Sequence, residues 1–201
     1  MGGRSQHVKS KSIIVGLSDG SGVIYGIFLL EYLKQVRIET HLIVSPAAKI
    51  TIVSETEYEL AEVEKLASKV HRFSDIAATI SSGSFPVYGM VVIPCSMHTI
   101  GSLASGIADN LLIRSAEVTL KERRKLVIVP GETPLALLDM RNMTKVARAG
   151  AIIAPAMPAF YQRPKSVDAV VDHVVGNVLD LLDIENDLFR RWHGKQTSYI
   201  S

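Results

Sequence analysis

Short apolar runs alternate along the chain with longer segments in which apolar residues recur at helical spacing. Runs such as "SIIVGLS" are short, rich in β-branched residues and bounded by turn residues, which is typical of buried strands. The pattern predicts strands over 12–18, 39–45, 88–96, 125–132 and 151–158. It predicts helices over 22–36, 46–56, 59–68, 108–122, 133–150 and 166–183.

Apolar strands that alternate with amphipathic helices predict a doubly wound parallel sheet with helices on both faces. The expected class is α/β, a three-layer αβα arrangement of the flavodoxin-like or Rossmann-like type. Ligands of such folds bind at the carboxyl ends of the strands. The segments in which to look for chemistry are therefore 16–22, 45–49, 94–99, 130–134 and 155–161.

The composition supports one domain. The chain has 201 residues, of which 47% are hydrophobic, and this is enough to fill the core of a single domain. Because no linker, repeat or low-complexity tract divides the chain, we expect one domain over 12–192. We expect a flexible segment over 1–11 and a tail over 193–201.

Charge and cysteine content exclude several classes of protein. The net charge of +2 gives no broad footprint for nucleic acid. No apolar run has the length of a membrane span, and no apolar core of a signal peptide follows the first residues. Cys95 is the one cysteine, so an internal disulfide framework and a multi-cysteine metal site are excluded. We expect a cytoplasmic protein with no nucleic-acid or membrane partner.

The loop "GLSDGSGVIYG" (16–26) follows the first predicted strand. It fails the dinucleotide fingerprint, because Tyr25 stands where the third glycine belongs, and it fails the Walker pattern, because Ser21 replaces the second glycine. A short glycine- and serine-rich loop before a helix suits one phosphate group. The alternative is a turn without a ligand, capped by Asp19 or Ser21. The loop alone leaves both interpretations open.

Hydroxyl groups also follow other predicted strands. Ser45 follows the second strand, and Ser96 and Thr99 follow the third. Each of them alone is more simply a helix cap. Because the carboxyl ends of parallel strands meet at one edge of a sheet, their convergence favours a mononucleotide site.

Six segments in order resemble one family. They are "GLSDGSGVIYG", "VSPAAKITIVSETEY", "ISSGSF", "MVVIPCSMHT", "ADNLLIRSAEVTLKERRKLVIVPGETPL" and "PAMPAFYQRPKSVDAVVDHVV". On these motifs, which run from about residue 12 to Trp192, the chain resembles the flavin prenyltransferases of the UbiX type.

The resemblance implies a flavodoxin-like fold that binds FMN. It implies transfer of a dimethylallyl group from dimethylallyl phosphate or pyrophosphate to reduced FMN, with bonds at N5 and C6 and closure of a fourth ring. No metal is required. It further implies a homododecamer with each site at a junction of subunits, and a UbiD-type decarboxylase as the partner that receives the prenylated flavin.

The resemblance also assigns residues to three roles. It places the flavin against Asp19, Gly20, Ser21, Ser45, Ser96, Met97, His98, Thr99 and Arg114. It places Ser21, Glu55 and Glu132 at the reacting edge of the flavin as catalytic residues. It places the prenyl phosphate against Ser82, Gly83, Lys121 and Tyr161, with Trp192 near the prenyl group.

These roles fit the chemistry, because cleavage of an allylic C–O bond creates a phosphate leaving group and an allyl cation. A lysine stabilises the first, and an aromatic wall stabilises the second by about 0.5–2 kcal/mol per contact. Local explanations stand beside several of the roles. Lys121 ends a helix and complements its dipole, Arg114 is within reach of Glu117 or Asp109, Glu55 is an exposed helix residue, Trp192 anchors the tail, and Cys95 is a small buried residue.

The chain departs from the family pattern at three positions. Asp19 replaces a glycine of the first loop, Gly131 replaces an arginine, and Asn177 replaces a basic residue. Loss of two charge-assisted contacts costs about 3–6 kcal/mol of anion binding. An alternative is therefore a family member that binds FMN without prenyl transfer and acts as a flavin carrier or decarboxylase-associated subunit. We expect the Asp19 carboxylate to cap the following helix or to face away from the phosphate.

A third alternative is a flavin-dependent cysteine decarboxylase. "PCSMHT" is similar to a motif of that group, but Pro158 stands where the group has an asparagine. We rank this alternative last.

Overall fold

The computed structural model describes residues 12–192 and 194. The predicted N-terminal segment 1–11 and all of the predicted tail except residue 194 lie outside these described residues. Within the described part, no helix combines the length and the apolar character needed to cross a bilayer.

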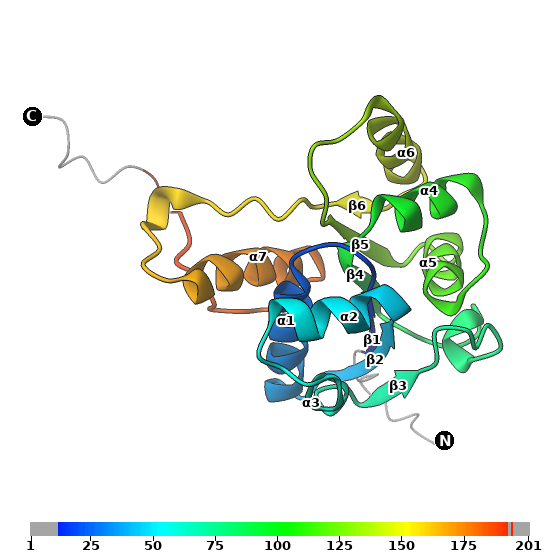
Figure 1. The fold of residues 1–201 in the computed structure, drawn as a ribbon, viewed down its shortest axis with the longest axis horizontal. Coiled ribbons are helices and arrows are strands. Elements are labelled where there is room, and N and C mark those ends of the chain that lie inside the picture. The colour runs from blue at the N-terminus through cyan, green and yellow to red at the C-terminus, as the bar shows by residue number, and fades with distance from the viewer. Residues whose placement is uncertain (1–11, 193, 195–201) are drawn as a thin grey trace, which may run out of the picture.

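Strands and helices alternate along the chain (Figure 1). The strands are β1 (Ser12–Leu17), β2 (Glu39–Val44), β3 (Lys69–His71), β4 (Gly89–Cys95), β5 (Lys125–Pro130) and β6 (Ile152–Ile153). The α-helices are α1 (Val23–Gln35), α2 (Pro46–Glu55), α3 (Leu60–Glu64), α4 (Met97–Ser105), α5 (Leu111–Lys121), α6 (Leu137–Arg148) and α7 (Val167–Leu181). Two short 3₁₀ turns, η1 (Thr79–Ser81) and η2 (Phe160–Gln162), complete the chain.

The six strands form one parallel sheet in the order β3-β2-β1-β4-β5-β6. The direction of winding reverses between β1 and β4, so this is the switch point at which open α/β sheets bind ligands. Without the three-residue edge strand β3, the order is that of flavodoxin-like folds. The predicted doubly wound α/β fold is confirmed.

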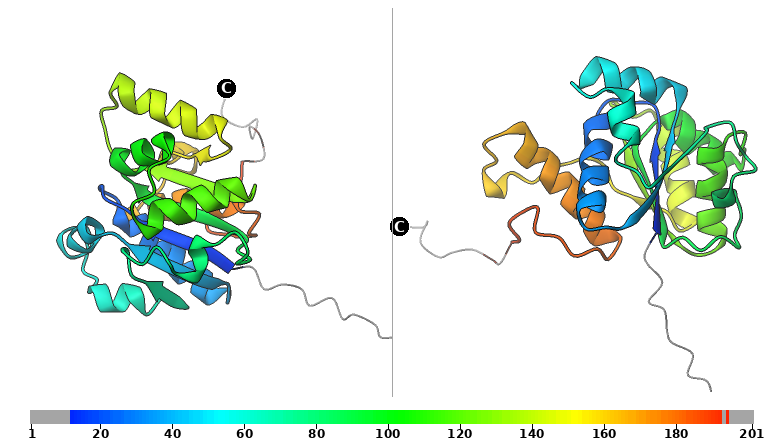
Figure 2. Two further views of the ribbon diagram at one scale, coloured as in Figure 1. Left: turned by 90° about the vertical axis from the view of Figure 1, so that its right-hand side faces the viewer. Right: turned by 90° about the horizontal axis from the view of Figure 1, so that it is seen from below.

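Helices cover both faces of the sheet (Figure 2), and an apolar core cluster lies between the sheet and each layer of helices. Alternate residues of β1 point to opposite layers, since Ile13 belongs to one core cluster and Ile14 to the other. The first layer is supplied by α1, α2 and α7, and the second by α4, α5 and α6. The predicted three-layer arrangement is therefore also confirmed.

Several predicted boundaries are wrong. The strand predicted over 151–158 is only two residues long, because Pro155 and Pro158 cannot donate to a ladder. The helix predicted over 133–150 begins at Leu137, after a loop. The pattern missed β3, which has only three residues, and α4, whose sequence "MHTIGSLAS" is poor in large apolar residues.

An arm extends from the rest of the molecule (Figure 1). We use the term arm for residues 154–166 together with the N-terminal half of α7. In Figures 1 and 2 the arm lies on the side of the sheet that faces away from α5. The arm carries exposed apolar side chains, namely Met157, Phe160, Tyr161 and Val167.

Candidate functional site

The loop after β1 has a backbone that glycine adopts most easily. Gly20 and Gly22 have φ values of 116° and 93°. Gly22 is the N-cap residue of α1, and no side chain caps this helix. Neither Asp19 nor Ser21 caps α1, although the interpretation of the loop as a turn without a ligand included such a cap. The N-terminus of α1 therefore faces the loop without a side-chain cap.

Hydroxyl groups from two strand ends form one buried cluster. The Ser18 Oγ lies 2.7 Å from the Thr99 Oγ1 and 3.1 Å from the Ser96 Oγ. Ser96 also caps α4, since its Oγ accepts the Thr99 N–H at 3.2 Å. The cluster ties the end of β1 to the end of β4. Sequence reasoning left Ser18 out of its site residues, although its position directly after a strand was a usable signal.

Asp19 joins the same loop to the end of β2. The Ser45 hydroxyl donates to the Asp19 Oδ1 at 2.6 Å, and the Ser45 Oγ accepts the Ala48 N–H at 3.0 Å as the N-cap of α2. Of the two arrangements expected for Asp19, the cap of the helix after its own loop is wrong, since no side chain caps α1; the arrangement in which the carboxylate faces away from a phosphate stays a prediction. Because the one hydroxyl proton of Ser45 goes to Asp19, the carboxylate fixes the orientation of Ser45.

Two glutamates bind backbone N–H groups at the same edge of the sheet. The Gly22 N–H donates to the Glu55 Oε2 at 3.0 Å, and the Met97 N–H donates to the Glu132 Oε1 at 2.8 Å. The first of these N–H groups belongs to the N-cap of α1 and the second to the first residue of α4. Glu55 thus lies at the N-terminus of α1 and Glu132 at the N-terminus of α4, and a helix N-terminus stabilises a negative charge.

The loops after β1 and β5 approach each other closely. A Cβ atom added to Gly131 would lie 2.9 Å from the Pro94 Cβ and 2.9 Å from the Ser21 carbonyl oxygen. A Cβ atom added to Gly20 would lie 3.3 Å from the Gly131 carbonyl oxygen. The two glycines therefore let two loop backbones lie side by side at the switch point. We use the term rim for the loops that follow β1, β2, β4 and β5 at the carboxyl edge of the sheet.

The sulfur of Cys95 lies under the rim. Cys95 is fully buried, and burial raises the pKa of its thiol far above the ordinary value, with smaller contributions from Glu132 and Asp19. The expectation of a small buried residue is confirmed, because a neutral buried thiol is a poor nucleophile.

Three predicted residues of the prenyl-phosphate site lie far from the rim in the structure. Ser82 and Gly83 precede β4, and Lys121 ends α5, so all three are at the amino edge of the sheet, opposite the rim. Arg124 holds their loop by donating to the Gly83 and Phe85 carbonyl oxygens at 2.7 and 2.8 Å. Within one copy of the chain these residues do not meet the rim.

Arg114 lies on α5 and pairs with a neighbour on the same helix. Its Nη1 lies 2.7 Å from the Glu117 Oε2. Of the two local partners considered for Arg114 in the sequence, Glu117 is the one that the structure places against it.

The remaining predicted residues lie on the arm and beside it. The rings of Tyr161 and Trp192 are 5.4 Å apart in an edge-on arrangement, and the Tyr161 hydroxyl donates to the Arg190 carbonyl oxygen at 3.2 Å. Asn177 lies one turn after His173, with its Nδ2 3.2 Å from the His173 Nδ1. The predicted site residues thus form three separate groups in one chain.

The rim combines its place at the switch point with polar groups that could contact a phosphate-bearing ligand. The rim lies at the switch point, where open α/β sheets bind ligands, and glycines at 20 and 131 let the loops after β1 and β5 pack side by side there. The exposed Ser21 and His98 and the N-termini of α1, α2 and α4 add polar groups along the same edge. Among the described residues no cluster of three or more His, Cys, Asp or Glu side chains has the arrangement of a metal site.

Comparison with known proteins places the chain among flavoproteins. The family model described as Flavoprotein matches residues 2–179. The flavin prenyltransferase UbiX of Escherichia coli (strain K12) is 50% identical over 187 residues, which cover 92% of this chain and 99% of that protein. A probable UbiX-like flavin prenyltransferase of Bacillus subtilis (strain 168) is 49% identical over 182 residues, or 90% of this chain and 89% of that protein.

Solved structures agree with these relatives. AnUbiX (PadA1) in complex with FMN and dimethylallyl pyrophosphate superposes with a TM-score of 0.92 at 45% identity, covering 94% of this chain and 100% of that one. A dodecameric FMN-dependent UbiX-like decarboxylase from Escherichia coli O157:H7 gives a TM-score of 0.89 at 47% identity, with 91% and 100% of the two chains covered. The peptidyl-cysteine decarboxylase EpiD is 21% identical with a TM-score of 0.60, so it shares the fold alone.

Proposed function

The chain belongs to the UbiX-type flavin prenyltransferase family, and on that premise we propose that it transfers a dimethylallyl group from dimethylallyl phosphate or pyrophosphate to reduced FMN. The observation that carries the proposal is the rim, where the loops after β1, β2, β4 and β5 meet at the switch point. The family relation supports it, since a relative with a TM-score of 0.92 was crystallised with FMN and dimethylallyl pyrophosphate.

The rim residues would hold the flavin and its protons. Gly20, Ser21, Ser45 and the segment 96–99 would bind FMN through backbone N–H groups, hydroxyls and helix N-termini. When bound and reduced, FMN supplies the nucleophilic ring atoms N5 and C6. Glu55 and Glu132 would accept and return protons there, because their carboxylates are already fixed at the rim by the Gly22 and Met97 N–H groups.

The other two groups of predicted residues would complete the site from neighbouring copies. We propose a homododecamer like that of the UbiX-like relative, so that the groups separated within one chain meet between chains. The exposed apolar side chains Met157, Phe160 and Trp192 support assembly, since monomeric proteins rarely expose so many together. Lys121 would stabilise the leaving phosphate and Trp192 the allyl cation, without a metal ion. A UbiD-type decarboxylase would receive the product.

One assay tests the proposal. The purified chain is incubated under anaerobic conditions with reduced FMN and either donor, with EDTA in a parallel series, and the flavin is analysed by mass spectrometry. We expect a flavin heavier by one prenyl unit, with or without EDTA. Absence of this product, while a known active relative forms it, would contradict the proposal.

A matched pair of variants localises the chemistry. Glu55→Gln should lower turnover by about 10²-fold or more, whereas Glu57→Gln, two residues further along the chain, should not. Equal rates for the two variants would remove Glu55 from the proposed machinery.

A further inference from the structure

Asp19 brings to the rim a carboxylate that the proposed proton transfers do not use. Glu55 and Glu132 each accept a backbone N–H group at the start of a helix. Asp19 instead accepts a side-chain hydroxyl, that of Ser45, at 2.6 Å. Because the Ser45 hydroxyl is also the N-cap of α2, Asp19 acts on the start of that helix through Ser45.

The hydroxyl of Ser45 can offer a ligand only an acceptor. It has one proton, and because an ionised carboxylate has no proton to give, the proton goes to Asp19. One of its two lone pairs accepts the Ala48 N–H at 3.0 Å. One lone pair is left for a ligand. Asp19 thereby turns a hydroxyl that could donate to a phosphate oxygen into an acceptor.

The start of α2 has few N–H groups left for an anion. Pro46, the first residue of the helix, has no N–H. The Ala48 N–H donates to the Ser45 Oγ, and the Lys49 N–H donates to the Ser45 carbonyl oxygen at 3.1 Å. Of the first four residues of α2, Ala47 alone keeps an N–H without one of these partners. An anion site at a helix N-terminus uses several such groups, so this helix start is a poor place for a phosphate.

The charge of Asp19 is not neutralised by an ion pair. Within the described part of the chain, no Lys, Arg or His side chain lies within 4 Å of its carboxylate. Burial, Glu132 and Asp19, in that order, raise the pKa of the Cys95 thiol, so the charge of Asp19 also acts beneath the rim. The second carboxylate oxygen is therefore an acceptor beside the free lone pair of Ser45. We use the term corner for Asp19 and Ser45 together.

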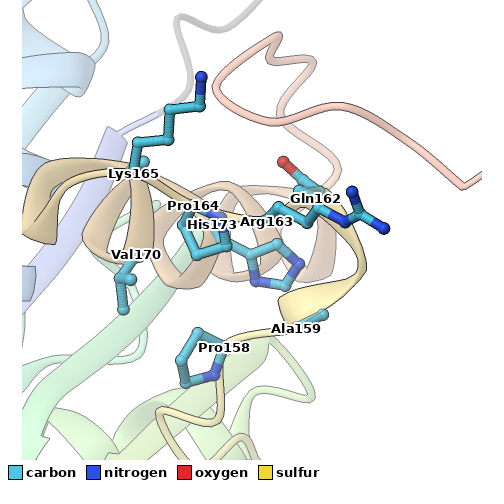
Figure 3. Close-up of a pocket in the computed structure, with 9 residues that line it drawn as sticks. Pro158, Ala159, Gln162, Arg163, Pro164, Lys165, Val170 and His173 are labelled. Carbon is cyan, nitrogen blue, oxygen red and sulfur yellow. The ribbon is translucent and has the colours of Figure 1, made fainter.

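Positive charge without a carboxylate partner is found on the arm. Figure 3 shows the side chains of Arg163 and Lys165 there, extending in different directions from the loop beside α7. Neither side chain forms an ion pair with a carboxylate of the described residues. Since the arm extends away from the rest of the molecule (Figure 1), these charges do not offset that of the corner within one chain.

The parts of a flavin nucleotide differ in what they can offer to such a corner. The phosphate carries negative charge and acceptors. The ring N3–H is a donor, but it lies between two carbonyl oxygens that acceptors would repel. The ribityl chain carries hydroxyl groups, and each of them can donate. A carboxylate binds a ribose hydroxyl in dinucleotide-binding folds by the same kind of bond.

We propose that Asp19 is a specificity-determining residue, which accepts a hydroxyl of the ribityl chain and keeps the phosphate of the flavin away from the start of α2. The corner supplies acceptors, and the ribityl chain supplies donors without a negative charge or a flanking carbonyl group. The inference rests on the proposed function, which puts a flavin at the rim. It is particular to this chain, because the family pattern has a glycine at position 19.

Titration of the purified full chain with FMN, riboflavin and lumiflavin, followed by flavin fluorescence, tests the proposal. Riboflavin lacks only the phosphate, and lumiflavin lacks the whole ribityl chain. Asp19→Ala should weaken the binding of FMN and riboflavin alike, by about 10-fold or more, because each loses a hydrogen bond to a charged group. Lumiflavin has no hydroxyl to lose, so its affinity should change by less than about twofold.

A matched control removes a carboxylate outside the rim. Asp75 follows β3, and its Oδ1 accepts the Ala77 N–H at 3.2 Å. Asp75→Ala should bind all three flavins like the wild type. A variant that only loosened the fold would lower the affinity for lumiflavin as well, so the comparison of the three flavins separates a direct contact from a structural effect.

The other outcomes overturn the proposal. Tighter binding of FMN by Asp19→Ala, with riboflavin unchanged, would show that the carboxylate opposes the phosphate. An equal loss for all three flavins would exclude a specific contact with the ribityl chain. Unchanged affinity for FMN and riboflavin would remove Asp19 from the site, and absence of flavin binding by the wild type would overturn the inference altogether.

A second variant keeps the test decisive if Asp19→Ala does not fold. Asp19→Asn keeps the shape of the side chain and an oxygen that accepts from Ser45, but it loses the charge. It should weaken FMN and riboflavin by the same factor, about threefold or more, because the bond to the ribityl chain is no longer charge-assisted. A gain for FMN alone, or no change for either flavin, would overturn the proposal in this variant too.

Prenylation is measured in parallel so that the two proposals fail separately. If the variants change flavin affinity as expected but the wild type makes no prenylated flavin, the proposed function is wrong and the role of Asp19 stands. If the wild type makes prenylated flavin but the affinities follow one of the contrary patterns, the role of Asp19 alone is wrong.

Discussion

Replacement of Gly131 by alanine should loosen the rim. The added Cβ atom would lie 2.9 Å from both the Pro94 Cβ and the Ser21 carbonyl oxygen, a distance that real Cβ atoms essentially never show. The oxygen belongs to backbone, so relief requires movement of a loop rather than of a flexible side chain. The φ of Gly131 is outside the left-handed region, and hence the steric clash alone causes the penalty.

The size of the effect follows from overpacking. Extra methyl groups in well-packed sites cost about 1–3 kcal/mol. For a domain of this size, 1 kcal/mol shifts the unfolding temperature by about 2–4 °C, so Gly131→Ala should lower it by about 2–12 °C. A displaced loop should also weaken FMN binding, by about fivefold for each kcal/mol by which the binding free energy falls.

Calorimetry and quenching of flavin fluorescence measure the two effects. Gly101→Ala is the control, because its Cβ atom would have only one neighbour, the Asn142 Nδ2 at 3.4 Å. Gly101 lies within α4, where alanine stabilises a helix by about 0.5–1 kcal/mol, so this variant should unfold at the same or a higher temperature. If Gly131→Ala matches the control in both measurements, the close approach of the two loops is not a constraint and the reasoning fails.

Three further outcomes are expected. Glu132→Gln should keep FMN affinity within about threefold, because the amide oxygen can still accept the Met97 N–H. It should lower prenylation about 10²–10⁴-fold in the anaerobic assay, because the amide is no longer a base. Unchanged turnover would contradict this prediction. Ser18→Ala should destabilise the fold by about 1–2 kcal/mol in urea unfolding, since Thr99 loses its 2.7 Å partner; a neutral result would show that the hydroxyl cluster is unimportant. Burial lowers the pKa of His41, and it lowers the pKa of His71 from 6.5 to about 4, so the unfolded chain binds more protons than the folded chain. The free energy of unfolding should therefore decrease as the pH falls from about 6.5 to about 4. His71→Gln should flatten this dependence in urea unfolding at several pH values, and equal slopes for the wild type and the variant would refute the assignment.

The sheet was predictable because its central strands are strongly apolar. β1, β4 and the middle of β5 are buried on both faces and appear in the sequence as continuous apolar runs. The edge strand β3 was not predictable, since the polar sequence "KVH" becomes a strand only by pairing with β2. Likewise, α4 depends on its Ser96 cap and on packing against α6 more than on an apolar stripe of its own.

The candidate site was predictable in its location but not in its contacts. The positions of Ser45 and Ser96 after strands were sufficient to place both at one edge of the sheet. No pattern indicated that Asp19 would accept from Ser45, because that pairing depends on how two loops separated by a whole helix leave the sheet. The separation of Lys121 from the rim, in contrast, follows from the predicted elements, because a residue that ends a helix just before a parallel strand lies at the amino edge of the sheet.

The reversal of winding between β1 and β4 has a consequence for synthesis. β1 is made first, but half of its pairing waits for β4, and the rim waits until the loop after β5 has left the ribosome. A nascent chain can therefore form the β1-to-β3 half of the sheet early and still lack a place for a flavin. Because a ligand stabilises only the state that binds it, a ligand bound at the rim would stabilise the completed sheet and not the half that forms early.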